Sequence, residues 1–420
     1  MEKNIHTVIL NCAQYEPLVH TSKLLLEKYT REIIRTFAKI GENFKSENII
    51  VGASKADKDT IELLEDVVSD YPSVLLKIYD GAYPAGDEYV LTYELTGQVI
   101  SANSSPIEEG IAVFNVESVY NMYLELEKRI PKTHKWVSVL GEVEKPVTLR
   151  VPLGTKAGDV VKEAGNITCE NPVYLIGGPM SGKPGSKLTR IDNTTDAIII
   201  LPEDHQVIYS KKTNSSIELK RAISSCCNCM RCTELCPRNL LGHPVDPQGF
   251  IRAASYKDMG NVDKFLNTMF CSSCGLCEMY SCIQGLSPKL LMTEYKKGLK
   301  ENGITEHHAP LNEVNDDRKY RKISIKRLTS RLALTRYDKL TLLKEMNWPD
   351  TNVKISLIEN KECPAKAIVC LNDLVTEGQI IATFEDADKF PLYATISGIV
   401  TEVTEQYIFI ENQGGRTDNE

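Results

Sequence analysis

The sequence predicts a multidomain protein of the α/β plus α+β class. Three observations lead to this prediction: strand-like and helix-like segments alternate near the N-terminus, two short cysteine runs lie in the middle, and the C-terminal part is rich in strand-forming segments. A chain of 420 residues usually folds into about three domains, and its apolar content of 42% is enough to build sizeable cores.

Composition and charge exclude several kinds of function. The net charge of −8 and the pI near 5.6 argue against general nucleic-acid binding, which needs a basic surface. The longest aliphatic run, residues 197–201, is far shorter than the ~20 apolar residues of a membrane-spanning helix. The first residues also lack the continuous apolar segment of a secretory signal. We therefore expect a cytoplasmic protein with no nucleic-acid partner and no membrane span; peripheral membrane association stays open.

Residues 1–130 have the pattern of a mainly parallel α/β sheet. We expect strands at 7–10, 48–52 and 74–78, separated by helices whose apolar residues recur at a spacing near 3.6. Right-handed βαβ connections place such strands side by side in parallel. Because ligands bind beyond the carboxyl ends of parallel strands, residues 11–17 and 81–87 are candidate binding segments.

Three further regions follow along the chain. Residues 131–212 combine strand-like segments, one short helix and a glycine turn, which is typical of a small α+β module. The cysteine region covers 213–300, and a polar linker then leads to a β-rich region at 318–412. We expect four domains with these bounds. Residues 318–339 are strongly basic, which fits a solvated connector better than a docking site for an acidic redox partner.

Eight of the 13 cysteines form two tight runs of regular spacing, and a ninth, Cys227, lies within the first run. A disulfide framework suits small secreted chains, so metal binding is the better interpretation. The first run consists of Cys226, Cys229, Cys232 and Cys236, followed by Pro237. Without Cys227, its spacing is C-x2-C-x2-C-x3-C-P, the pattern of bacterial ferredoxins, in which three thiolates hold one [4Fe–4S] cluster and the fourth reaches another.

The second run is Cys271, Cys274, Cys277 and Cys282, with the spacing C-x2-C-x2-C-x4-C and no proline. Crossed ligation predicts that Cys282 completes the first cluster and that Cys236 completes the second. Structural zinc, which also uses C-x2-C pairs, is the alternative. We expect Cys227 to be a non-ligand, or to replace Cys226. Two clusters on one such unit are close enough to exchange electrons, so the pattern predicts an electron-transfer protein.

Four short segments resemble motifs of a known family. They are Asn-Cys-Ala-Gln-Tyr-Glu-Pro at 11–17, Tyr-Pro-Ala-Gly-Asp-Glu at 83–88, Leu-Thr-Gly at 95–97 and Phe-Asn-Val-Glu-Ser at 114–118. With these segments the chain resembles the RnfC/PduS group of electron-transfer proteins over nearly its whole length. Its N-terminal region also resembles the flavin-carrying, NADH-oxidising subunit of respiratory complex I.

The resemblance implies a fold for each region. It implies a truncated complex-I-flavoprotein-like α/β domain, a β-grasp (SLBB) module around 136–200, a helical dicluster ferredoxin domain and a C-terminal barrel-sandwich β domain.

The resemblance also implies that the N-terminal segments line a pocket for FMN and NADH, and it implies no catalytic residue. The implied cofactor-binding residues are Asn11, Glu16, Gly86, Asp87, Glu88, Asn115 and Glu117. For Glu16, Asp87 and Glu88, turn formation and helix capping are alternative roles.

The N-terminal motif departs from the family pattern. Cys12, Gln14 and Tyr15 stand where the family has glycine, glutamate and cysteine. The family's glycine-rich loop, which would cradle the FMN phosphate with backbone N–H groups, should precede the first strand, and this sequence starts just after that point. The resemblance therefore implies either a pocket without flavin or a sequence that is part of a longer product.

Four functions compete at this stage. The leading hypothesis is an electron-transfer subunit that takes electrons from NADH through FMN and passes them through two [4Fe–4S] clusters to a partner reductase. Resemblance to the proline-reductase-associated branch of the family makes proline reductase a candidate partner. The alternatives are a flavin-free relay, a cobalamin reductase of the PduS type and a zinc-stabilised scaffold.

Overall fold

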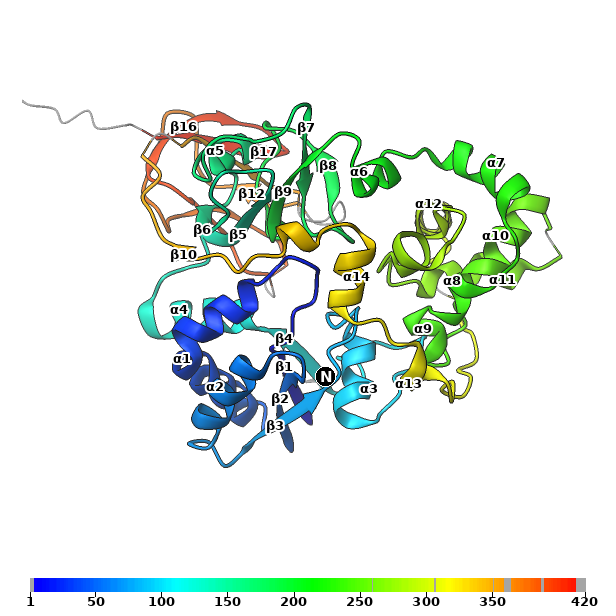
Figure 1. The fold of residues 1–420 in the computed structure, drawn as a ribbon. Helices are drawn as coiled ribbons and strands as arrows, with labels where there is room; N and C mark the ends of the chain where they lie inside the picture. The colour runs from blue at the N-terminus through cyan, green and yellow to red at the C-terminus, as the bar shows by residue number, and fades with distance from the viewer. Residues whose placement is uncertain are drawn as a thin grey trace, which may run out of the picture. The chain divides into compact units, whose positions relative to one another are not determined.

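The computed structural model describes residues 4–258, 260–305, 307–349, 351–358, 364–386 and 389–412 (Figure 1). The chain divides into two compact units, which are treated separately below. Unit 1 comprises Met1–Val119, Gly178–Gly182 and Glu203–Asp338. Unit 2 comprises Tyr120–Gly177, Lys183–Pro202 and Lys339–Glu420. No helix in the described part of the chain is long and apolar enough to cross a membrane.

The N-terminal part of unit 1 is a four-stranded parallel sheet in the order β3-β2-β1-β4. Its strands are β1 (Thr7–Asn11), β2 (Asn48–Ser54), β3 (Val74–Tyr79) and β4 (Ile111–Asn115). The helices of this region are α1 (Thr21–Asn43), α2 (Lys58–Val68), α3 (Glu88–Thr96) and the start of α4 (Val116–Lys128), whose residues from Tyr120 on belong to unit 2. All five residues of β1 are buried, as expected for a central strand with both faces covered.

Local sequence signals explain where these helices begin and end. The Asp57 side chain accepts a hydrogen bond from the Thr60 amide and caps the N-terminus of α2. Asp87 does the same for α3 by accepting from the amides of Tyr89 and Val90. Gly97 ends α3 in the left-handed conformation (φ 76°), which glycine adopts without steric cost.

The rest of unit 1 is helical and contains both cysteine runs. Its elements are α6 (Gln206–Lys211), α7 (Ser215–Ser225), α8 (Arg231–Glu234), α9 (Pro237–Leu240), α10 (Pro247–Tyr256), α11 (Val262–Leu266), the 3₁₀ helix η1 (Asn267–Phe270), the π-helix η2 (Cys277–Ser281), α12 (Pro288–Glu301), α13 (Arg318–Arg321), α14 (Ile325–Arg331) and the 3₁₀ helix η3 (Thr335–Tyr337). Phe250, Phe265 and Tyr295 pack with ring centroids 5.2–6.0 Å apart and join α10, α11 and α12.

Arg318 and Lys322 of the basic stretch at 318–339 form ion pairs within unit 1. The Arg318 guanidinium lies 2.6 Å from the Glu94 carboxylate and stacks on the Tyr93 ring. The Lys322 ammonium bridges Glu94 and Asp80 at 2.8 and 2.9 Å. Arg318 and Lys322 are therefore neutralised by carboxylates within unit 1.

The described part of unit 2 contains three sheets. The six-stranded sheet has the order β10-β6-β5-β9-β7-β8, the four-stranded sheet β11-β17-β16-β13 and the three-stranded sheet β12-β14-β15. The elements are β5 (His134–Gly141), β6 (Val147–Pro152), α5 (Ala157–Lys162), β7 (Pro172–Ile176), β8 (Lys183–Gly185), β9 (Ala197–Pro202), β10 (Leu343–Lys344), β11 (Val353–Ser356), β12 (Lys366–Ala367), β13 (Leu374–Val375), β14 (Ile380–Thr383), β15 (Leu392–Tyr393), β16 (Gly398–Val403) and β17 (Tyr407–Glu411). Of the two cysteines in this region, Cys363 lies outside the described residues and Cys370 is exposed.

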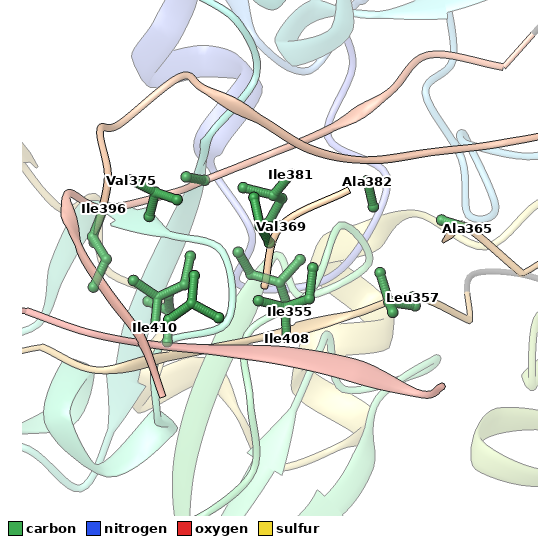
Figure 2. Packing of buried hydrophobic residues seen from close by; sticks show 13 residues of the cluster. Ile355, Leu357, Ala365, Val369, Val375, Ile381, Ala382, Ile396, Ile408 and Ile410 are labelled. Carbon is green, nitrogen blue, oxygen red and sulfur yellow. The ribbon is translucent and has the colours of Figure 1, made fainter. Parts of the chain in front are cut away.

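The four-stranded and three-stranded sheets of unit 2 enclose one hydrophobic core (Figure 2). Ile408 and Ile410 alternate with outward-facing residues along β17, as the period of two in a strand requires. They meet Ile355 from β11 in the same sheet and Ile381 from β14 in the other. The mixed α/β architecture with several domains predicted from the sequence is therefore present.

Burial in this core predicts the cost of truncating Ile408, which is 0% exposed. Ile408→Ala should lower the free energy of unfolding of this region by about 2–5 kcal/mol, because the removed atoms lose burial and leave a cavity. The matched control is Ile368→Ala, because Ile368 is 57% exposed; it should change stability by no more than about 0.5 kcal/mol. Chemical denaturation followed by circular dichroism measures both, and equal losses would contradict the assignment of this core.

Candidate metal and flavin sites

Four cysteines from both runs line one cavity in unit 1. The cavity is lined by Cys226, Cys229, Cys232 and Cys282 together with Cys227, Met230, Gln248, Ile251, Ile283, Gln284, Leu286 and Pro288. The first three cysteines come from the first run and the fourth comes from the second. We call Cys226, Cys229, Cys232 and Cys282 the first quartet.

The other four cysteines line a second cavity. Its cysteines are Cys236, Cys271, Cys274 and Cys277, and its other lining residues are Pro237, Arg238, Val245, Pro247, Ser272, Gly275, Leu276 and Lys289. We call these four cysteines the second quartet. The structure thus brings the cysteines together in the crossed combination that the spacing predicts.

The turns of the cysteine loops explain how short segments surround each cavity. Asn228, Met230, Ser273 and Gly275 have φ between 54° and 82°, so each loop curls tightly between its cysteines. Backbone amides of Ser273 and Leu286 donate to the sulfur atoms of Cys271 and Cys282 at 3.3 Å. Such N–H···S bonds stabilise thiolate ligands of a cluster.

The longer spacing before Cys282 has a structural explanation. Cys277–Ser281 forms a π-helix, and the Cys282 amide donates to the Cys277 carbonyl at 3.2 Å. A π-helical turn accommodates one residue more than an α-helical turn. The extra residue of C-x4-C is therefore taken up locally. In the first run Pro237 begins α9 directly after Cys236, where no amide is required.

The chemistry of the quartets fits a positively charged metal group. Burial, aided by neighbouring cysteines, raises the pKa of Cys232 and of Cys274 to about 12. Without a metal these thiols would therefore stay protonated at neutral pH. Within the described residues no three cysteine, histidine or acidic side chains lie close enough to share one metal ion, and each quartet instead spreads around a cavity wall.

The residues predicted to bind flavin and NADH lie at the carboxyl edge of the parallel sheet, but several already have protein partners. The buried Asn11 amide donates to the Ala85 carbonyl at 2.9 Å, and its oxygen accepts from Ala13 and Tyr79. The Glu16 carboxylate accepts from the amides of Met180 and Ser181 at 3.0 and 2.9 Å. Burial is the largest influence on the Glu16 carboxyl and raises its pKa.

Asp87 holds a buried ion pair in addition to capping α3. Its carboxylate lies 2.8 Å from the guanidinium of Arg238, which stacks 3.6 Å above the Tyr89 ring. His243 packs edge-on against Tyr89 and lies within hydrogen-bonding distance of the Ile100 carbonyl at 2.9 Å. Arg238 also lines the second cavity, so this cluster connects the α3 loop to the second quartet.

The remaining predicted flavin residues are more accessible. Gly86, Glu88 and Asn115 are exposed, and Glu117 is half-buried in the first turn of α4. The Asn115 side chain accepts from the Ser118 amide at 2.7 Å at the end of β4. A Cβ atom at Gly86 would lie 2.9 Å from that of Tyr15, so glycine lets these two loops approach. This edge of the sheet is therefore exposed at Gly86, Glu88 and Asn115.

Sequence patterns did not identify the contact that joins the flavin-type region to the second quartet. The Tyr83 hydroxyl donates to the Cys274 carbonyl at 2.6 Å, over 191 positions in the sequence. Neither did they identify residues 178–182, whose Met180 carbonyl accepts from both Lys211 and Lys289. The glycines that flank this loop, in Gly-Gly-Pro-Met-Ser-Gly, were the available signal.

Comparison with known proteins identifies two domain types and full-length relatives. Residues 1–124 match the family model of the Nuo51 FMN-binding domain, and residues 225–287 match that of the 4Fe-4S dicluster domain. Cobalamin reductase PduS of Citrobacter freundii is 30% identical over 98% of this chain and 91% of its own length. PduS of Salmonella typhimurium is 28% identical with the same coverage of both chains.

Two more distant similarities cover less of each partner. The ion-translocating oxidoreductase complex of Klebsiella pneumoniae contains a protein that is 23% identical over 56% of this chain and 30% of its own length. The structure of an NAD⁺-reducing [NiFe]-hydrogenase in its H₂-reduced state matches with a TM-score of 0.46 and 14% identity, over 72% of this chain. This chain spans 57% of that hydrogenase chain.

A domain of the FMN-binding type joined to a [4Fe–4S] dicluster domain defines an electron-transfer flavo-iron–sulfur protein. The predicted cofactor types, FMN and [4Fe–4S] clusters, are those of the two matched domains. The chain belongs to the RnfC/PduS-like family, as the resemblance in the sequence indicated.

His243 gives the site a predictable pH dependence. Burial, with a smaller contribution from Arg238, lowers its pKa to about 4. An unfolded histidine has a pKa near 6.5, so between these values the unfolded state binds a proton that the folded state does not. Protonation of His243 therefore favours the unfolded state as the pH falls through this range. At neutral pH, where His243 is neutral in both states, this loss of stability is absent.

We expect His243 to account for about 2 kcal/mol of the stability that the protein loses between about pH 7 and pH 5. His243→Gln should remove that part of the pH dependence, whereas His308→Gln, at an exposed position, should leave it unchanged. Anaerobic chemical denaturation at several pH values measures the difference, and parallel curves for wild type and His243→Gln would contradict the prediction.

Proposed function

We propose that this chain oxidises NADH with an FMN bound at the carboxyl edge of β1–β4 and delivers single electrons to a redox partner through two [4Fe–4S] clusters. The observation that supports this most is the sorting of eight cysteines into two crossed quartets around neighbouring cavities. A flavin accepts the electron pair of a hydride and releases electrons singly, which is the exchange that one-electron clusters need.

We assign the first cluster to Cys226, Cys229, Cys232 and Cys282, and the second to Cys236, Cys271, Cys274 and Cys277. FMN would contact Gly86 and Asn115, and Glu88 and Glu117 lie at the same edge. Three other residues would support the FMN-binding loops without contacting FMN, because their side chains hold these loops through the contacts described above. They are Asn11, Glu16 and Asp87. The Tyr83–Cys274 hydrogen bond supports an order in which the second cluster lies on the flavin side.

The surroundings of the first quartet support an electron exit there. Cys229 is exposed, and Met230 and Ile283, which line the same cavity, are 46% and 53% exposed. A partner that docks on this apolar surface would approach the first cluster closely.

The similarity to cobalamin reductase favours a corrinoid on a partner protein as the acceptor. A terminal reductase such as proline reductase is the other candidate for the partner. We also propose four domains at 1–130, 131–212, 213–300 and 318–412, with residues 136–200 as the SLBB β-grasp module and the last domain as a barrel-sandwich domain. The two sheets around one core support the last assignment. A cytoplasmic location stays a prediction from the sequence.

Absorption spectroscopy of anaerobically purified protein tests this function. We expect a flavin band near ~450 nm over a broad iron–sulfur shoulder, and both should bleach on addition of NADH. Addition of a cob(III)alamin should then restore the absorbance as the corrinoid is reduced. A shoulder without flavin, insensitive to NADH, would support the flavin-free relay instead, and colourless protein with bound zinc would support the scaffold.

Variants of single cysteines test the ligand assignment. Cys277→Ser should remove the second cluster and lower the iron content from about eight to about four per chain. The matched control is Cys370→Ser, because Cys370 is exposed and lies outside both quartets. Its iron content should match wild type. Unchanged iron in Cys277→Ser would contradict the second quartet.

A further inference from the structure

The two cysteine cavities differ in the charge of their walls. Two cationic side chains, Arg238 and Lys289, line the second cavity. The residues that line the first cavity in the described part of the chain are cysteines and neutral side chains only. Any group held in these cavities therefore meets different electrostatic surroundings.

Lys289 lies directly over the turn that carries two ligands of the second quartet. A Cβ atom placed on Gly275 would be 3.5 Å from its ammonium nitrogen, so that ammonium lies against the backbone between Cys274 and Cys277. The ammonium also donates to the Met180 carbonyl at 3.0 Å, which fixes its position. Its side chain is only 17% exposed, so solvent screens its charge weakly.

The cations near the second quartet are not equally neutralised. Arg238 forms a close ion pair with Asp87 at 2.8 Å, whereas the Lys289 ammonium lies 3.8 Å from the carboxylate of Glu278. Lys296, seven residues further along α12 and so on the same face of the helix, donates to the Cys271 carbonyl at 3.0 Å. The helix thus directs two ammonium groups at the second quartet.

A [4Fe–4S] cluster becomes more negative when it accepts an electron, so a nearby fixed cation stabilises its reduced state. We propose that Lys289 raises the reduction potential of the second cluster relative to the first, and so tunes this cluster to accept electrons from the flavin side. This inference rests on the proposed function, because it requires that the second quartet holds a cluster.

Redox titration followed by EPR tests the role of Lys289 in the intact protein with both clusters loaded. The test variant is Lys289→Gln, which removes the charge and keeps a donor for the Met180 carbonyl. At a fixed potential the ratio of reduced to oxidised second cluster should fall about tenfold, a downward shift of about 59 mV for one electron. The first cluster is the internal reference, and the signal lost in Cys277→Ser identifies the second.

Two further variants serve as controls. Lys289→Arg keeps the charge and should keep the wild-type potential. Lys297→Met removes a lysine of the same helix whose side chain is 73% exposed, and it should shift neither cluster. If Lys289→Gln fails to fold or to retain iron, Lys289→Met is titrated in its place under the same criteria.

A selective downward shift of the second cluster in the neutral variants supports the inference. Unchanged potentials, or equal shifts of both clusters, would overturn it while leaving two clusters in place. Failure of the proposed function is distinguishable, since wild-type protein would then lack two clusters by iron analysis before any variant is compared.

Discussion

The crossing of the two quartets is the constraint on which the cysteine region depends. Each run supplies three thiols to one cavity and its last thiol to the other, so neither cavity is complete without both runs. The chain between the two runs must therefore fold back to bring them together. Phe250 and Phe265, which lie in this connecting segment, are part of the hydrophobic core of the cysteine region. Because neither cavity exists in the unfolded chain, we expect folding of this region and binding of iron to be coupled.

A second set of contacts joins this region to the N-terminal sheet. The Met180 amide donates to Glu16, while the carbonyl of the same residue accepts from Lys211 and Lys289. Hydrogen bonds to charged groups each contribute about 1.5–3 kcal/mol, more than neutral ones. Residues 178–182 thus connect the loop after β1 to the wall of the second cavity. Glu16, a residue of the flavin-type motif, stabilises this connection through its hydrogen bond with Met180.

Local patterns predicted much of the fold and of the cysteine arrangement. Alternating strand-like and helix-like apolar segments predicted the parallel strands, because the spacing of apolar residues that distinguishes a strand from a helix is a property of residues close together in the sequence. The crossed quartets followed from C-x2-C spacing, since a short loop limits where its thiols can point. The partners of Glu16 and Asp87 could not be predicted, because Met180 and Arg238 lie 164 and 151 positions away and no local period encodes them. For the same reason the pairing of Leu343 in β10 with Thr148 in β6 was not foreseen.

The most direct test of the account is the EPR spectrum of the fully reduced protein, purified without oxygen and loaded with iron and sulfide. Two crossed quartets predict two reduced [4Fe–4S] signals in equal amounts, broadened by magnetic interaction between neighbouring clusters. A single isolated signal, or an EPR-silent protein whose cysteines hold zinc, would contradict it.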